Sequence, residues 1–271
     1  MCRWLAYYGA PILMSDLLIT PEHNLIQQSL KANAPRTPTN GDGFGLGWYA
    51  KQPQPGLFRS IRPAWNDTNL QDLALHIESP LFMAHVRATS LATIQETNCH
   101  PFRYKNWLFM HNGQIAKFEL VRRDLLLKVA PKYFNNIQGT TDSELMFHLA
   151  LTYGLEEDVN SAITRMVQEV EAAACQQGIE ESLWMTLAIS DGKNLWAFRY
   201  GSNGKGPSLY ISPDIDELVK LNPELKGHFG DFAVCIVSEP IGKHTDAWRE
   251  IPEQSKVLVE DSSLLVSIFE T

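Results

Sequence analysis

Short apolar runs bounded by Gly, Pro, Asn or Thr dominate the first 110 residues, a pattern that is typical of strands. The pattern predicts strands at Cys2–Tyr8, Phe44–Tyr49, Leu81–Arg87 and Trp107–Met110. Apolar residues instead recur at helical spacing over Leu17–Lys31 and again over Lys117–Tyr133. The first half of the chain is therefore expected to be rich in strands, with helices between them.

The chain changes character at Gly139, where polar residues precede the apolar run Leu145–Tyr153. Thr141 and Glu144 have the spacing of a capping box, in which each side chain bonds the other residue's backbone N–H and opens a helix. A second helix is predicted over Asp158–Gln177, because apolar residues recur there at helical spacing and Gly178 follows as a stop.

Strands are predicted again after these helices. They cover Ser182–Ser190, Leu195–Tyr200, Pro207–Ser212, Phe232–Ser238 and Val257–Ile268. An order of strands, helices and strands favours an α+β protein with two sheets and helices outside them. No internal repeat or long linker is visible, so a single domain over 1–271 is expected.

Composition and charge limit the classes of partner that the protein is expected to bind. The 23 Lys and Arg against 31 Asp and Glu give a net charge of -8, with no basic cluster suited to phosphates, so nucleic acid is not an expected partner. No apolar run approaches the roughly 20 residues needed to span a bilayer, and no secretory signal is recognisable. We therefore expect a cytoplasmic protein with no membrane partner, whose four cysteines are separate thiols.

Cys2 is the first candidate for chemistry. Removal of Met1 would give it a thiol and a free α-amine, which are a nucleophile and a base within one residue. The α-amine has an ordinary pKa of about 7.7 to 8.0, so it can accept the thiol proton near neutral pH. Position alone also fits a buried structural cysteine.

Three further positions carry candidate binding groups. His111-Asn112-Gly113 follows the predicted strand Trp107–Met110, where the Asn112 amide and the Gly113 N–H could form an oxyanion hole, although Asn-Gly also makes turns. Arg87 ends a predicted strand and could hold a carboxylate, or lie on the surface. Asp142 begins a helix and could meet an ammonium group, or serve as a plain helix cap.

Other motifs do not support nucleotide or metal binding. The glycines from Gly41 to Gly47 alternate, but Leu46 stands where a dinucleotide fingerprint needs its third glycine. Alternation places these glycines on one strand face, where a backbone or a ligand could approach closely. His85, His100 and His111 lack zinc-motif spacing, so we expect hydrogen-bonded structural histidines, no metal and no cofactor.

Six motifs in order together resemble the class II glutamine amidotransferases, which are N-terminal-nucleophile hydrolases. They are Met1-Cys2-Arg3-Trp4-Leu5, the segment from Asn40 to Tyr49, His85-Val86-Arg87, Asn98-Cys99-His100-Pro101-Phe102, His111-Asn112-Gly113 and Thr141-Asp142-Ser143-Glu144. Ser238-Glu239-Pro240 extends the likeness toward the C-terminus. The resemblance implies a four-layer αββα sandwich, and its glycine-rich segment is most similar to standalone γ-glutamyl hydrolases of ergothioneine biosynthesis and glutathione degradation.

The resemblance also implies roles. Cys2 would attack a γ-glutamyl amide and form a thioester, Asn112 and Gly113 would hold the oxyanion, and Arg87 and Asp142 would bind the substrate's α-carboxylate and α-ammonium. The mature chain would start at Cys2. The leading hypothesis is an amidohydrolase acting on a small γ-glutamyl substrate. The alternatives are a glutaminase subunit that supplies ammonia to a separate synthase, with a synthase or peptidase as partner protein, and a silent γ-glutamyl-binding protein.

Overall fold

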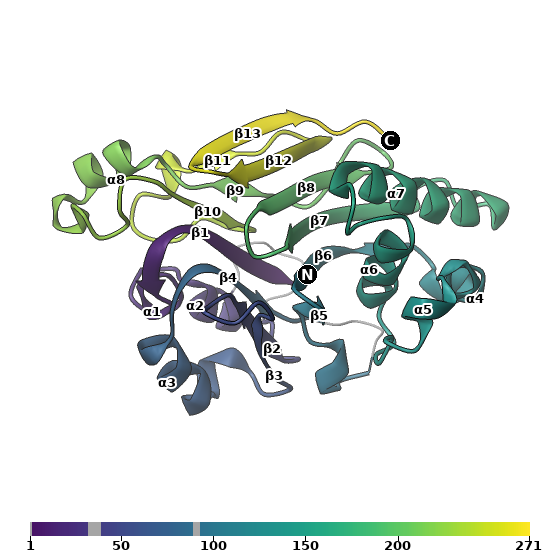
Figure 1. Ribbon diagram of the computed structural model, residues 1–271, viewed down its shortest axis with the longest axis horizontal. Helices are drawn as coiled ribbons and strands as arrows, with labels where there is room; N and C mark the ends of the chain where they lie inside the picture. The colour runs from purple at the N-terminus through teal and green to yellow at the C-terminus, as the bar shows by residue number, and fades with distance from the viewer. Residues whose placement is uncertain (1, 32–38, 89–92) are drawn as a thin grey trace.

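The computed structural model describes residues 2–31, 39–88 and 93–271 (Figure 1). Seven of the described strands form one sheet, and six form another. The first sheet has the order β11 (Arg249–Glu250), β9 (Tyr210–Ile211), β10 (Ala233–Val237), β1 (Arg3–Leu13), β4 (Glu78–Val86), β2 (Phe44–Trp48) and β3 (Gly56–Ser60). The second has the order β13 (Ser263–Ile268), β12 (Ser255–Glu260), β8 (Leu195–Gly201), β7 (Leu183–Ser190), β6 (Trp107–Ile115) and β5 (Phe102–Tyr104).

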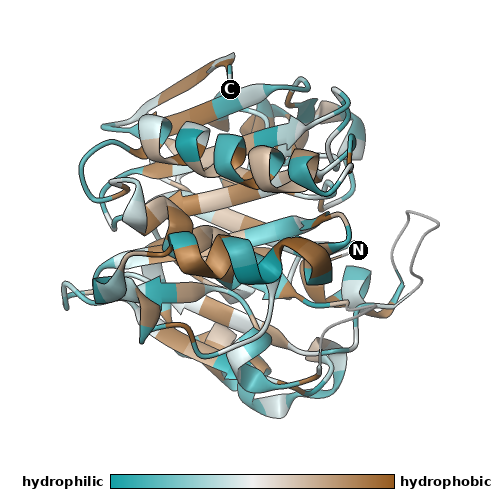
Figure 2. Ribbon diagram, turned by 90° about the vertical axis from the view of Figure 1, so that its right-hand side faces the viewer, coloured by the Kyte–Doolittle hydropathy of each residue, from teal (hydrophilic) through white to brown (hydrophobic). Residues whose placement is uncertain are grey.

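Helices cover the outer face of each sheet (Figure 1). The first sheet carries α1 (Ser15–Leu18), α2 (Leu25–Leu30), α3 (Thr68–His76) and α8 (Ile215–Leu221). The second carries α4 (Phe118–Lys128), α5 (Pro131–Phe134), α6 (Asp142–Thr152) and α7 (Val159–Gln176). Figure 2 turns the helices of the second sheet toward the viewer and shows that they carry both apolar and polar surfaces. Within α6, every residue from Ser143 to Leu151 is buried.

Three apolar clusters separate the layers. One contains Trp4, Met83 and Met110 and lies between the two sheets. A second lies between the first sheet and its helices, and the third lies between the second sheet and α4–α7. The four-layer αββα sandwich implied by the resemblance is therefore confirmed, and so is the α+β class expected from the strand and helix order.

Alternation along each strand decides which side chains reach the space between the sheets. Trp4 and Ala6 of β1 belong to the inter-sheet cluster, whereas Leu5 and Tyr7 face the helices. On β4, Leu81 and Met83 face inward in the same way. The same parity places the side chains of residues 2, 85 and 87 on the inter-sheet side.

Two predicted helices are wrong in their extent. The run Leu17–Lys31 breaks into α1 and α2 around Pro21, which has no backbone N–H to continue a helix. Asn24 then caps α2 by accepting a hydrogen bond from the Gln27 N–H at 2.9 Å. The run Lys117–Tyr133 likewise divides into α4 and α5, because Pro131 restricts the residue before it and begins the second helix.

Two predicted strands are also wrong in their extent. The run Val257–Ile268 is a hairpin of β12 and β13, and Asp261 and Ser262 take the positive φ angles of 42° and 60° at the turn between them. The run Pro207–Ser212 contributes only the two residues of β9. The predicted helix over Asp158–Gln177 corresponds to α7, which Asp158 caps, and Gly178 follows it at φ 69°.

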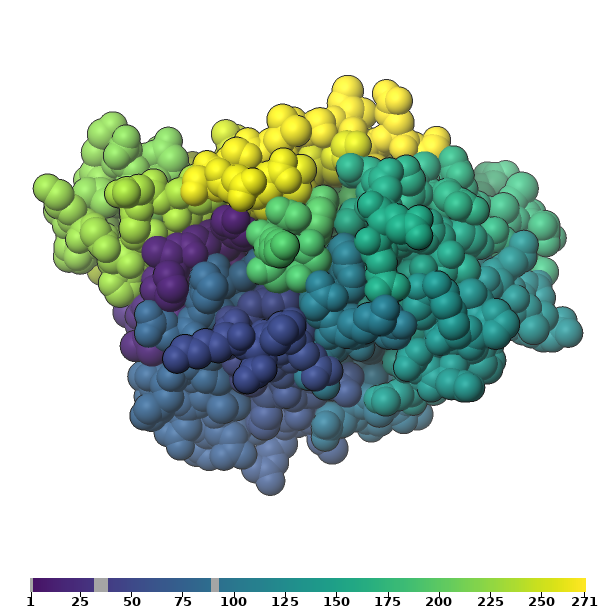
Figure 3. All heavy atoms as spheres, viewed as in Figure 1, coloured from purple at the N-terminus to yellow at the C-terminus, as the bar shows by residue number. Residues whose placement is uncertain are grey.

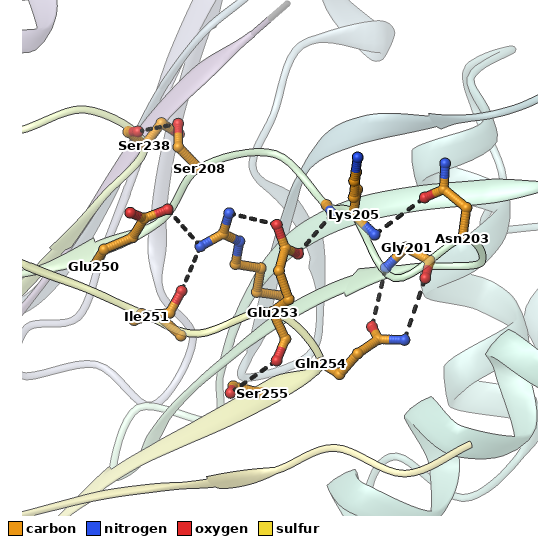
Figure 4. A network of polar contacts seen from close by, with 12 residues as sticks. Gly201, Asn203, Lys205, Ser208, Ser238, Glu250, Ile251, Glu253, Gln254 and Ser255 are labelled. Atoms are coloured by element: carbon orange, nitrogen blue, oxygen red, sulfur yellow. Dashed lines mark hydrogen bonds and ion pairs between the residues drawn. The ribbon is translucent and has the colours of Figure 1, made fainter.

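A polar network links β8, inside the second sheet, to β11 at the edge of the first sheet (Figure 4). Arg199 of β8 is buried and donates to Glu250 of β11 at 2.8 Å and to Glu253 at 2.7 Å. The same guanidinium bonds the carbonyl of Ile251. Because β8 and β11 belong to different sheets, Arg199 ties the sandwich together at this edge.

None of the described helices is both long and apolar enough to cross a lipid bilayer.

Candidate active site

Cys2 lies immediately before β1, in phase with Trp4 and Ala6, whose side chains face the second sheet. Its sulfur is 3.5 Å from both the backbone nitrogen and the carbonyl oxygen of Ala88, so the Ala88 N–H donates to Sγ. Burial raises the pKa of the Cys2 thiol, while the Ala88 N–H and the Arg87 guanidinium oppose that rise. A thiol with a raised pKa stays protonated near neutral pH, so it requires a local base before it can attack.

A buried ion pair holds the backbone of Cys2 in place. Arg3 donates through Nε to a Glu239 oxygen at 2.6 Å and through Nη1 to the carbonyl of Cys2 at 2.9 Å. Both Arg3 and Glu239 are buried. Both residues stand in motifs that resemble the family, but no role was predicted for either. The available signal was an arginine inside an otherwise apolar first strand.

Arg87 follows β4 directly, and its side chain is only 3% exposed, which excludes the surface alternative. Its backbone N–H donates to Gly43 at 2.8 Å, and its carbonyl accepts from Asp42 at 3.1 Å. The guanidinium makes long contacts to the carbonyls of Asp42 (3.4 Å) and Thr93 (3.3 Å). With five N–H donors available, it retains capacity to bind a carboxylate.

Asn112 and Gly113 lie inside β6, opposite Thr186 and Met185 of β7. The expected position just after a strand was therefore wrong, because the strand continues to Ile115. The turn alternative is excluded by the same pairing. Asn112 is buried, and its Oδ1 has no hydrogen-bond partner among the described residues.

Gly113 occupies a position where any side chain would clash with its neighbours. Its φ is +153°, and an added Cβ would collide with the carbonyl oxygen of Trp184. A Cβ there would also lie 2.5 Å from the His111 ring. Glycine at this point lets β6 stay paired with β7 without a side chain in the way.

Asp142 is the first residue of α6, but it is not the cap. Thr141 caps the helix by accepting from the Glu144 N–H at 3.2 Å. The other half of the predicted capping box is wrong, because Glu144 accepts from the N–H groups of Gln138 (2.9 Å) and Gly139 (2.6 Å). Asp142 accepts from the N–H groups of Ile115 at 2.9 Å and Ser143 at 2.8 Å, which fix its carboxylate at the end of β6.

The five predicted site residues come together from both sheets. Cys2 and Arg87 enter from β1 and β4 of the first sheet, whereas Asn112 and Gly113 lie on β6 of the second. Contact between β1 and β6 joins these halves, and the charges of Arg87 and Asp142 both act on the Cys2 thiol. The Arg87 guanidinium and the Asp142 carboxylate thus lie near the Cys2 thiol, and Asn112 and Gly113 lie on the strand that contacts β1.

Three buried histidines, His85, His100 and His111, lie beside these residues. Burial lowers the pKa of His85 to about 3 and that of His100 well below its usual range, so both rings are neutral. His85 donates from Nε2 to the carbonyl of His111 at 3.2 Å, and His111 bonds Ser143 through Nδ1 at 2.8 Å. The expectation of hydrogen-bonded histidines fails for His100, because neither of its ring nitrogens has a partner among the described residues.

The glycine-rich segment packs directly against Cys99 and His100. A Cβ on Gly45 would collide with the carbonyl of His100, and one on Gly43 would lie 2.6 Å from the sulfur of Cys99. These glycines therefore let the Cys99–His100 segment approach β2. Among the described residues, no group of three or more His, Cys, Asp or Glu side chains is arranged to hold a metal.

A cavity of about 440 Å³ lies elsewhere, on the helix side of the first sheet. Its lining includes Tyr7 of β1, Asp16 of α1 and Leu218 of α8, and none of the five predicted site residues lines it. In the space-filling view, the light-green segment with α8 forms a lobe beside the purple β1 (Figure 3).

Comparison with known proteins identifies the relatives of this chain. Residues 17–254 match the family model of the class II glutamine amidotransferases. The probable glutamine amidotransferase DUG3 of Saccharomyces cerevisiae is 33% identical and matches 98% of this chain and 84% of its own length. The γ-glutamyl-hercynylcysteine sulfoxide hydrolase of Mycolicibacterium smegmatis is 26% identical over 98% and 99% of the two chains. A solved class II domain protein from Silicibacter pomeroyi superposes with a TM-score of 0.76 at 30% identity, with both chains covered completely.

Proposed function

The chain belongs to the class II glutamine amidotransferase family, and we propose that it hydrolyses the γ-amide of glutamine or of a larger γ-glutamyl compound with Cys2 as the nucleophile. The convergence of Cys2, Arg87 and Asn112 on the space between the sheets carries this proposal. Amide hydrolysis in general follows from the family and from its hydrolase relatives. The proposal adds the reacting residue, the course of the reaction and the γ-glutamyl substrate.

Arg87 and Asp142 would select the glutamyl head group. The Arg87 guanidinium can donate two parallel hydrogen bonds to the α-carboxylate of the substrate. The Asp142 carboxylate is held by two backbone N–H groups and can accept from the α-ammonium. Opposite charges on the two sides of the site favour a free amino acid head over a peptide-linked one, because only the free head carries both charges.

Acyl transfer would begin once Met1 has been removed. The α-amine of Cys2 accepts the thiol proton, and the thiolate attacks the γ-carbonyl carbon of the substrate. The carbonyl oxygen becomes an oxyanion, to which the Asn112 amide and the Gly113 N–H donate. When the tetrahedral intermediate collapses, its C–N bond breaks, and the protonated α-amine delivers its proton to the leaving nitrogen.

Water would complete the cycle. The products of the first step are a γ-glutamyl thioester on Cys2 and free ammonia or an amine. The free α-amine then takes a proton from water, and the resulting hydroxide attacks the thioester carbonyl. Collapse of this second intermediate breaks the C–S bond and releases glutamate, and the protonated α-amine returns its proton to the Cys2 sulfur, which restores the thiol and the free amine.

The γ-glutamyl class is supported by one relative, which is a γ-glutamyl-hercynylcysteine sulfoxide hydrolase. The group beyond the scissile amide would be contacted by loops. One such loop is the segment 32–42, of which the structure describes residues 39–42. The proposed specificity of Arg87 and Asp142 therefore concerns the glutamyl head group of the substrate.

Glutamate release tests the proposal. The protein is incubated with glutamine and with a set of γ-glutamyl dipeptides, after mass spectrometry has verified that Met1 is absent. We expect glutamate to appear with at least one of these compounds, and no activity from Cys2→Ala. Cys175→Ala is the matched control, since Cys175 is an exposed thiol on α7. If the protein releases glutamate from none of these compounds, the proposal is refuted.

A further inference from the structure

The two halves of the site belong to different sheets, so their relative position depends on how the sheets are held together. Cys2 and Arg87 move with β1 and β4, whereas Asn112 and Gly113 move with β6. Apolar packing between the sheets is non-directional. By itself it sets the spacing of the sheets more firmly than their alignment.

Two directional contacts cross between the sheets beside these residues. His85 of β4 donates from Nε2 to the carbonyl of His111 on β6 at 3.2 Å. The indole of Trp4 on β1 donates to the hydroxyl of Thr186 on β7 at 3.1 Å, and that hydroxyl donates to the carbonyl of Asn112 at 3.4 Å. Both contacts therefore end on the backbone that carries the predicted oxyanion donors.

The donors of these two contacts are neighbours in the first sheet. Trp4 and His85 are direct partners in the register of β1 and β4. His85 lies two residues before Arg87, and Trp4 lies two residues after Cys2. One hydrogen bond runs from His85 to β6 and the other from Trp4 to β7, and β6 and β7 are neighbours. Together they limit both the separation and the sliding of the two sheets near Cys2 and Arg87.

The His85 ring is itself held in one orientation. A carbonyl can only accept, so Nε2 carries the proton, and the ring stacks on His100 with centroids 4.1 Å apart. Its side chain is fully enclosed, and Nδ1 has no hydrogen-bond partner among the described residues. Among the described residues, the hydrogen bond from Nε2 to the His111 carbonyl on β6 is the one polar contact of the His85 ring. The ring therefore has no second partner with which to relay a proton.

We propose that His85 is a positioning residue which, with the Trp4–Thr186 contact, holds the oxyanion donors of β6 in register with Cys2 and Arg87. This inference rests on the proposed function, because it concerns the same site. It assigns a role outside the groups that touch substrate. Misplacement of a reacting group by about 1 Å can lower a rate by roughly 100-fold.

His85→Leu tests the inference, with Tyr49→Phe as its matched control. The Tyr49 hydroxyl also crosses between the sheets and lies 2.8 Å from the carbonyls of Asn106 and Ser190, to either of which it can donate. Asn106 lies six residues before Asn112, or about 20 Å along an extended strand. We expect His85→Leu to lower kcat at least tenfold and Tyr49→Phe to change it less than threefold. Alkylation of Cys2 by iodoacetamide, followed on the N-terminal peptide, forms no oxyanion and should stay within twofold in both.

Hydrogen exchange supplies a readout that needs no turnover. Amides of residues 111–115 should exchange at least tenfold faster in His85→Leu than in Tyr49→Phe. Equal exchange in the two variants, or equal kcat, would overturn the inference even if the native protein hydrolyses γ-glutamyl amides. If the native protein hydrolyses none, the proposed function fails, and exchange alone decides the inference.

Thr186→Val is the second variant, should His85→Leu fail to fold. It removes the hydroxyl that joins Trp4 to Asn112 while keeping a β-branched side chain of similar shape. We expect a fall in kcat of at least fivefold with unchanged alkylation of Cys2. A native kcat in a folded Thr186→Val protein would contradict the inference.

Discussion

Acidification should destabilise this protein through His85, by an amount that follows from its burial. Its pKa is about 3 in the folded protein against an ordinary value of 6.5. Below pH 6.5 the unfolded chain binds a proton at this histidine, whereas the folded chain does not until about pH 3. The contribution of neutral, buried His85 to the free energy of unfolding is therefore fully present above pH 6.5. It is lost as the pH falls, because the unfolded state binds more protons.

The size of the effect can be worked out. Each pKa unit is worth 1.36 kcal/mol, so a shift of about 3.5 units corresponds to about 5 kcal/mol when fully developed. At pH 5.0 the unfolded histidine is almost entirely protonated and the folded one is not, which gives a loss of about 2 kcal/mol. At pH 7.5 the loss is close to zero.

Comparison with His85→Gln isolates this contribution from those of the other histidines. Glutamine can still donate to the His111 carbonyl but does not titrate. Urea unfolding of both proteins, followed by the fluorescence of the seven tryptophans, gives four free energies at pH 7.5 and 5.0. The stability advantage of the native protein over the variant should shrink by about 2 kcal/mol at the lower pH. An advantage that is the same at both pH values would refute the buried, neutral state of His85.

Three other predictions concern the site. Asn112→Ala should raise the barrier by about 2.7 to 4 kcal/mol, or roughly 100- to 1000-fold in kcat, and a change below fivefold in steady-state assays would contradict an oxyanion role. Gly113→Ala should lower the melting temperature more than Gly178→Ala, because both have positive φ but only Gly113 meets a carbonyl oxygen, while open space surrounds Gly178; calorimetry of the two variants checks this order. The rate should rise about tenfold from pH 6 to pH 7, as the Cys2 α-amine with its ordinary pKa near 8 loses its proton, and a flat profile in glutamate-release assays would exclude the amine as base.

Local patterns in the sequence predicted the architecture well where a rule acts over a few residues. Strand alternation identifies β1, β2, β4 and β6, and a threonine three residues before Glu144 marks the start of α6. The same short range explains two errors. The helical spacing over Leu17–Lys31 outweighed Pro21 in the interpretation, and an Asn-Gly pair was read as a strand end although Gly113 continues the strand.

Contacts between distant residues were beyond the reach of one sequence. Arg3 and Glu239 are 236 positions apart, and nothing local marks the glutamate as the partner of that arginine. His111 was expected to be structural, but its bond to Ser143 depends on how α6 packs on β6. Motif resemblance named Cys2, Arg87, Asn112, Gly113 and Asp142, whereas the supporting residues around them required the fold.

The order of strands in the first sheet has a consequence for the birth of the protein. β1 leaves the ribosome first, yet one of its two neighbours is β10, whose residues are made more than 200 positions later. Until Ala233–Val237 emerge, the first strand cannot be enclosed on both edges. Cys2, which directly precedes this strand, therefore reaches its final surroundings only after most of the chain has been made.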